Sequence, residues 1–165
     1  MSRSARWRQA DRFDHQARLA APFAVLGVTT EEDWLVRIDY LPLGTPVLAP
    51  QSALAREVCE QLRAYLRDPR LRFDLPVRLS GTPFQQRVWE ALAAIPSGQT
   101  RSYAAVAKAL HTAPRAVGRA CGANPVPLVV PCHRVVAADG LGGFLHTRSD
   151  APVAIKRWLL EHERR

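Results

Sequence analysis

Cysteine is scarce in this sequence, and no residues have the spacing of a metal site. The three cysteines, Cys59, Cys121 and Cys132, form no Cys-x-x-Cys pair, and the five histidines are scattered along the chain. An odd and low number of cysteines argues against a disulfide framework and indicates a reducing compartment. We therefore expect a cytoplasmic protein that binds no metal and needs no cofactor.

Long apolar runs are also missing. No segment approaches the ~20 consecutive apolar residues that a membrane-spanning helix needs. The first 18 residues are rich in arginine but lack the apolar stretch of a signal peptide. We therefore expect no membrane partner, and we expect residues 1–20 to form a basic, flexible tail.

Lysine is rare, whereas arginine is abundant. Only Lys108 and Lys156 are lysines among the 23 basic residues, and the formal net charge is +8. Such a balance favours an anionic partner, either nucleic acid or a membrane surface, and arginine suits bidentate contacts with phosphates and bases. A bias in genomic composition would produce the same excess of arginine, so the charge alone does not select the partner.

The length of 165 residues, 47% of them apolar, suits one compact domain or two small ones. Residues 21–80 predict a small α+β domain, because strand-like segments precede a proline-rich loop and a segment with apolar residues at helical spacing. The expected elements are strands over 23–28, 34–40 and 75–79 and a helix over 52–67. This half carries no visible chemistry.

Residues 81–165 predict a second, mainly helical domain. The expected helices cover 83–95, 103–110, 114–122 and 153–163. Ser102 and Thr112 stand where the N-caps of the second and third of these helices are expected. The short connection between those two helices is typical of a helix-turn-helix motif, although many small helical domains contain such a pair by accident.

The helix expected over 114–122 has very little side-chain bulk. Ala116, Gly118, Ala120 and Gly122 alternate along it, and glycine costs a helix about 1 kcal/mol relative to alanine. A bare helix lets its backbone approach a surface closely, including the minor groove of DNA. Close packing against another helix would explain the same residues, so the sequence leaves both interpretations open.

The segment 124–136 contains the most informative residues. Two prolines hold the chain extended, an apolar run follows, and Cys132 and His133 come next. A free thiol has a pKa of about 8.5 and needs activation at neutral pH, which an imidazole could provide. A cysteine after an apolar run is often only a core residue, and neighbours along a strand point to opposite faces, so their contact stays open.

A carboxylate near the C-terminus predicts the third member of a triad. Glu163 lies four residues after Leu159 and eight after Ile155, so it continues the apolar stripe of the last expected helix. A carboxylate there needs a partner, and His133 would serve. The prediction is Cys132 as nucleophile, His133 as base and Glu163 as orienting group. The alternative is a solvated glutamate at a frayed helix end.

Several sequence blocks together resemble a known family. Pro131-Cys132-His133-Arg134-Val135 looks like the active-site motif of the O6-alkylguanine-DNA alkyltransferases, also called methylated-DNA–protein-cysteine methyltransferases. The resemblance extends from about Gly81 to Glu163. It includes Thr82-Pro83-Phe84-Gln85, Tyr103, Arg115-Ala116-Val117-Gly118, Asn124-Pro125-Val126-Pro127 and residues 156–163. It implies a ribonuclease-H-like N-terminal α+β domain and a mainly helical C-terminal domain, which carries a helix-turn-helix and the active-site cysteine.

The resemblance also implies a function and a partner. The chain would be a monomeric DNA-repair protein that flips O6-alkylguanine, and also O4-alkylthymine, out of double-stranded DNA. It would transfer the alkyl group irreversibly to its own Cys132. His133 would take the thiol proton through a water molecule while Glu163 orients the imidazole, and the Asn124 side chain would hold the segment before the nucleophile.

Four further residues are expected to contact the DNA or the substrate. Tyr103 would help to rotate the target nucleotide and donate toward its base, and Arg115 would enter by the minor groove and fill the vacated space. Val135 and Phe144 would contact the substrate. Phe144 stands where the family commonly has tyrosine, and residues 145–152 replace a shorter glycine-rich turn. These departures put the pocket shape and the substrate range in question.

Three other functions compete with this interpretation. A non-catalytic DNA-lesion sensor of the alkyltransferase-like kind resembles the same fold but lacks the cysteine. A cysteine hydrolase would use Cys132, His133 and Glu163 but would leave Tyr103 and Arg115 unexplained. A plain helix-turn-helix regulator would not need the adjacent cysteine and histidine.

Overall fold

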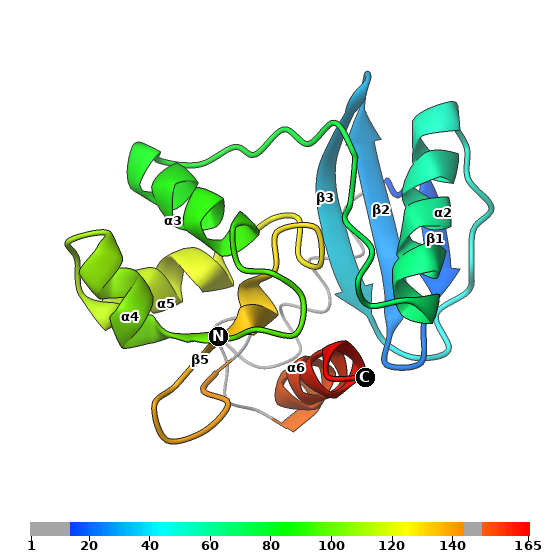
Figure 1. Ribbon diagram of the computed structural model, residues 1–165. Helices are drawn as coiled ribbons and strands as arrows, with labels where there is room; N and C mark the ends of the chain where they lie inside the picture. Colours follow the sequence, from blue (N-terminus) through cyan, green and yellow to red (C-terminus); the bar gives the residue numbers. More distant parts are fainter. Residues whose placement is uncertain (1–13, 144–149) are drawn as a thin grey trace. The chain divides into compact units, whose positions relative to one another are not determined.

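The computed structural model describes residues 14–143 and 150–165, so Phe144 lies outside the described part. The chain divides into two compact units, the first ending at Leu79 and the second beginning at Ser80 (Figure 1). Both helices and strands are present, and the mixed α+β class predicted from the sequence is confirmed. No described helix is long and apolar enough to cross a membrane.

The first unit is a three-stranded antiparallel sheet with one helix packed against it (Figure 1). The strands are β1 (Ala17–Ala20), β2 (Val25–Glu31) and β3 (Trp34–Leu41), in the order β1-β2-β3. Helix α2 (Ala53–Arg67) begins at Ser52, whose hydroxyl accepts a hydrogen bond from the Ala55 N–H. Its core-facing side chains recur at helical spacing and are fully buried, among them Val58, Leu62 and Tyr65.

Two expectations for this unit are wrong in detail. Residues 17–20 are not part of a flexible tail but form β1, with Ala17 paired to Val28. Ala17 and Leu19 alternate inward and are buried, and the half-buried arginine between them had hidden this strand pattern. The strand expected over 75–79 is reduced to one bridge between Leu35 and Val77. Pro76 offers a carbonyl there but no N–H, so it cannot continue a ladder.

The second unit is mainly helical. Its helices are α3 (Pro83–Ala93), α4 (Tyr103–Ala109), α5 (Pro114–Gly122) and α6 (Asp150–Glu163), and a single 3₁₀ turn covers Cys132–Arg134. Two very short strands, β4 (Arg101–Ser102) and β5 (Val135–Val136), pair in parallel. This pair joins the residues just before α4 to the residues just after the 3₁₀ turn. It therefore places the helix-turn-helix beside the segment that contains Cys132.

The connection between α4 and α5 differs from the prediction at one cap. Ser102 caps α4 as predicted, because its hydroxyl accepts from the Ala105 N–H. Thr112 does not cap α5. The backbone turns through the left-handed region at His111, with φ 55°, and this places Ala113 at the N-cap, where no side chain can accept. Pro114 then occupies the first helical position, which suits its fixed φ.

Helix α5 packs tightly on α3 along one of its faces. Ala120 is buried, and its carbonyl accepts a hydrogen bond of 2.9 Å from the indole N–H of buried Trp89 on α3. Part of the low bulk of α5 therefore serves helix packing, which was one of the two interpretations that the sequence left open. Trp89 is held from its other side by the close approach of Gly81, where an added Cβ would lie 2.5 Å from the ring.

We predict that Gly81→Ala destabilises the chain by about 1–3 kcal/mol, the usual cost of overpacking a buried contact. The new methyl group would meet Trp89, which cannot move without losing its bond to the Ala120 carbonyl. Urea unfolding of the purified protein measures the effect. Gly140→Ala is the matched control, because nothing lies within 4 Å of an added Cβ there. Equal stability of both variants would contradict the prediction.

Candidate functional site

The segment before Cys132 is folded around the side chain of Asn124. The Asn124 amide nitrogen donates to the Val130 carbonyl over 2.8 Å, and its amide oxygen accepts from the Val126 N–H over 3.0 Å. Between them Leu128 adopts a left-handed conformation, with φ 74°. This closed loop delivers Cys132 to the start of the 3₁₀ turn rather than to the end of a strand. The alternation of strand side chains, which had left the contacts of Cys132 and His133 open, therefore does not apply.

The Cys132 thiol is buried, and its surroundings act on its pKa in opposite directions. Burial raises the pKa of the thiol to about 11, while a hydrogen bond from the Asn124 side chain and the positive charge of Lys156 act to lower it. The residue is only 3% exposed. At neutral pH the resting sulfur is therefore a protonated thiol, and it needs a base before it can act as a nucleophile.

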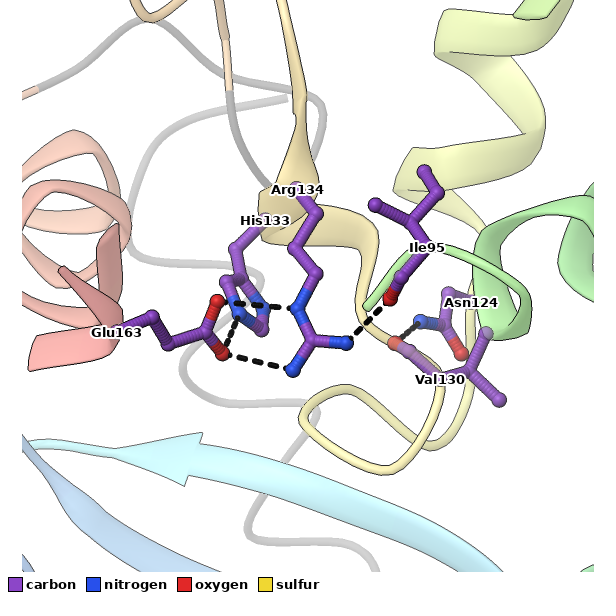
Figure 2. Close-up of polar contacts among 6 residues, drawn as sticks. All are labelled: Ile95, Asn124, Val130, His133, Arg134 and Glu163. Carbon is purple, nitrogen blue, oxygen red and sulfur yellow. Dashed lines mark hydrogen bonds and ion pairs between the residues drawn. The ribbon is translucent and has the colours of Figure 1, made fainter. Parts of the chain in front are cut away.

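His133 and Glu163 are in direct contact, as Figure 2 shows. The His133 Nε2 atom lies 2.7 Å from Oε1 of Glu163, and both side chains are almost completely buried. Burial alone would raise the pKa of Glu163, but hydrogen bonds from His133 and Arg134 outweigh it and lower this pKa to about 2. The carboxylate is therefore ionised at neutral pH and can only accept. Glu163 is thus a paired residue of the buried stripe and not a solvated helix end.

The protonation of His133 follows from this contact. Burial lowers the pKa of the imidazole, and the positive charges of Arg134 and Lys156 act in the same direction against the opposing effect of Glu163. The ring is therefore neutral at neutral pH, and Nε2 must carry its single proton, because an ionised carboxylate faces it. The lone pair then lies on Nδ1, which is buried and has no hydrogen-bond partner among the described residues. Nδ1 is the atom of this site that can accept a proton.

Arg134 completes the polar group in Figure 2. Its Nε and Nη2 atoms donate to the two oxygens of Glu163 over 3.0 and 2.9 Å, and Nη1 donates to the Ile95 carbonyl over 2.6 Å. The guanidinium is 10% exposed and the carboxylate 1%. The pair connects the 3₁₀ turn both to the last residue of α6 and to the chain just after α3.

Lys156 is a second buried cation in this unit. It is 0% exposed, and its ammonium group donates to the Val135 carbonyl over 2.7 Å, the Gly143 carbonyl over 3.1 Å and the Tyr103 hydroxyl over 3.4 Å. Burial lowers its pKa to about 8, so it still carries its proton at neutral pH. It joins three segments that are distant in sequence, namely the first turn of α4, strand β5 and the loop before α6.

The residues expected at the DNA are divided between the interior and the surface. Tyr103 is half-buried, with its hydroxyl donating to the Gly143 carbonyl over 3.3 Å, and an added Cβ at Gly142 would lie 3.0 Å from its ring. Val135 is fully buried. Arg115 lies exposed in the first turn of α5. The position expected for Phe144 lies outside the described residues.

Sequence reasoning missed Arg134 and Lys156 as site residues. A signal was available for Lys156, since it stands three, four and seven residues before Leu159, Leu160 and Glu163, and thus on the buried stripe of α6. Arg134 gave no such signal, because its partners come from distant parts of the chain. Within the described ranges, no group of three histidine, cysteine or acidic residues could hold a metal ion.

The second unit matches a family model described as 6-O-methylguanine DNA methyltransferase, DNA binding domain, over residues 83–165. A constitutive methylated-DNA–protein-cysteine methyltransferase of Bacillus subtilis is 38% identical over 138 residues, which make up 82% of this chain and 79% of that protein. A methylated-DNA–protein-cysteine methyltransferase of Metallosphaera sedula is 34% identical over 144 residues, 87% of this chain and 88% of the relative.

Solved structures agree with these relatives. The crystal structure of Mycobacterium tuberculosis OGT in complex with DNA matches with a TM-score of 0.75 and 36% identity, covering 89% of this chain and 91% of that one. An O6-methylguanine DNA methyltransferase from Methanococcus jannaschii matches with a TM-score of 0.64 and 29% identity, over 89% and 92% of the two chains. The chain belongs to the 6-O-methylguanine DNA methyltransferase family.

Proposed function

We propose that this chain is a DNA-repair alkyltransferase that moves the alkyl group of O6-alkylguanine in duplex DNA onto the sulfur of its own Cys132. The observation that carries the proposal is a buried thiol in the same short turn as a neutral histidine. The Nδ1 atom of that histidine has no partner within the part of the chain that the structure describes, and its Nε2 proton is held by an ionised carboxylate. Family membership supplies the substrate class. The same transfer from O4-alkylthymine is part of the proposal.

The proposed reaction is a single displacement. His133 takes the proton of the Cys132 thiol at Nδ1, through a water molecule, and Glu163 stabilises the imidazolium that forms. The thiolate attacks the alkyl carbon, a sulfur–carbon bond forms, and the bond between that carbon and O6 of guanine breaks. The electron pair of the broken bond stays on the guanine, which takes up one proton from water as it leaves, and His133 returns the thiol proton to water, so that the protons balance. Asn124 positions the loop that holds the nucleophile.

Access to a base in a duplex requires its extrusion from the helix. The helix-turn-helix of α4 and α5 is the element that we propose to lie against the DNA, with Arg115 exposed at the start of α5. Helix α5 has small residues beside Arg115, and Gly118 lies where an added Cβ would be 3.9 Å from the Tyr103 ring. In the proposed complex Arg115 fills the space left by the base, and Tyr103 acts near the rotated nucleotide.

The alternatives explain fewer of these contacts. A lesion sensor of the same fold would not need Cys132 or a neutral histidine in the same turn. A cysteine hydrolase would not need an exposed arginine on a bare helix of a helix-turn-helix. The three cysteines are all free, which fits the reducing conditions of the cytoplasm, where we propose that the protein works.

We predict a single-use reaction with at most one alkyl group removed per protein molecule. A thioether is not a leaving group under mild conditions, so the alkylated sulfur is not regenerated. Intact-protein mass spectrometry after incubation with duplex DNA that contains O6-methylguanine should show one added methyl group, located at Cys132 by peptide mapping. Cys132→Ala should show none, while Cys59→Ala, which changes a buried cysteine of the first unit, should react like the parent. Multiple turnover, or repair by Cys132→Ala, would overturn the proposed function.

Arg115→Ala should separate base extrusion from the chemical step. We expect repair of duplex DNA to slow by at least about tenfold, because extrusion costs a few kcal/mol and 1.4 kcal/mol corresponds to tenfold in rate. Reaction with free O6-benzylguanine needs no extrusion and should keep its rate. Arg119→Ala, another exposed arginine of α5, controls for the loss of general attraction to phosphates. If Arg115→Ala slows both substrates equally, Arg115 has no role in extrusion.

A further inference from the structure

The proposed reaction leaves Arg134 without a part, although it is nearly buried and makes three hydrogen bonds. We propose that Arg134 is a positioning residue that keeps His133 a neutral, proton-accepting base by pairing with the carboxylate that orients it. This inference rests on the proposed function, since it concerns the same site. It assigns a role to a residue whose side-chain hydrogen bonds go to Glu163 and to the Ile95 carbonyl.

The geometry shows a carboxylate shared by two donors of different charge. Oε1 of Glu163 faces His133 Nε2 at 2.7 Å and Arg134 Nη2 at 2.9 Å, while Oε2 receives Arg134 Nε at 3.0 Å. Two parallel donors of one guanidinium thus hold both oxygens in a fork. The third donor group, Nη1, is fixed 2.6 Å from the Ile95 carbonyl. The fork therefore fixes both the position of the carboxylate and the oxygen that it offers to the imidazole.

Electrostatics explains why the carboxylate needs this arginine. An unpaired buried carboxylate would favour the protonated form of His133, which cannot act as a base. An anion 2.7 Å from an imidazole favours the protonated ring, and a histidine that already carries two protons cannot take one from the thiol. A guanidinium bound to the same carboxylate opposes that effect, because its positive charge disfavours a second proton on the ring. Among residues 14–143 and 150–165, the charged and titratable groups around His133 are Glu163 and Lys156 from α6, and Cys132 and Arg134 from its own turn. Of these, Arg134 binds the carboxylate directly.

The direction of the pKa of His133 agrees with this geometry. Burial lowers it, Glu163 raises it, and Arg134 lowers it again. The neutral ring is the active form, so the transfer rate should fall as the pH drops through this pKa. With Arg134 in place that fall should occur below the ordinary histidine range, which centres at about 6.5. Without it the fall should move to higher pH.

The experiment is a pH–rate profile for reaction with free O6-benzylguanine, in which no DNA contact takes part. In Arg134→Gln the midpoint of the acid limb should rise by about one pH unit or more. The rate relative to the parent protein should therefore fall about tenfold further at low pH than at high pH. Arg157→Gln is the matched control, because Arg157 is the exposed neighbour of Lys156 on α6. An arginine that only stabilises the fold would lower the rate by the same factor at every pH, and that result would overturn the inference.

A second comparison covers the case in which Arg134→Gln does not fold. Glu163→Gln leaves the arginine as an unpaired cation beside His133, whereas Arg134→Gln/Glu163→Gln removes both charges together. Histidine NMR follows the titration of His133, whose signal is assigned by its loss in His133→Asn. His133 should titrate at lower pH in the single variant than in the double variant. Identical titration in the two would overturn the inference.

Failure of this inference differs from failure of the proposed function. If the parent protein forms no alkylated Cys132 with O6-benzylguanine or with alkylated duplex DNA, the proposed function is wrong. If the parent is alkylated at Cys132 and the removal of Arg134 leaves the acid limb unchanged, the function stands and the role of Arg134 is wrong.

Discussion

The hydrogen bonds that converge on Glu163 are the constraint on which the second unit depends. One carboxylate at the end of α6 holds His133 and Arg134 of the 3₁₀ turn, and Arg134 extends the connection to the Ile95 carbonyl after α3. A buried ion pair is costly to break, because the partner that remains is an uncompensated charge. The pair therefore specifies where the turn lies, and with it the position of Cys132. The low pKa of Glu163 keeps this arrangement intact throughout the neutral range.

Much of the fold could be predicted because its signals are local. The cap at Ser102 and helix α5 depend on a few neighbouring residues, and both agree with the structure. The predictions of secondary structure were wrong where the local composition did not reflect the contacts of the folded chain. Arginines concealed the alternation of Ala17 and Leu19, and a left-handed residue at His111 moved the cap of α5 away from Thr112. Neither the pairing of a short strand with a distant partner nor the sign of φ at a single residue can be read from periodicity.

The site could be predicted only in part, for a related reason. Cys132 and His133 are adjacent in the sequence, and Glu163 follows from helical spacing, so these three were accessible. Arg134 contacts residues 29 and 39 positions away, and which of 23 basic residues would be buried depends on those contacts. Lys156 resembles any surface lysine until its three acceptors are known. The burial of a cation in such a site therefore depends on contacts between distant parts of the chain, which the sequence does not reveal.

Burial of the thiol has a consequence that connects these observations to the proposed reaction. Because thiolates, not thiols, react with oxidants and stray electrophiles, a pKa of about 11 keeps Cys132 inert while no substrate is bound. A protein that can react only once gains from such protection. The cost is that the sulfur must be activated at the moment of transfer, by a base that is itself neutral in a buried site. Two buried cations act on different groups of the site: Lys156 favours the developing thiolate, and Arg134, bound to Glu163, opposes the effect of that carboxylate on His133. In this interpretation, burial keeps the Cys132 thiol protonated until substrate is bound, and the charges of Lys156 and Arg134 then permit its activation.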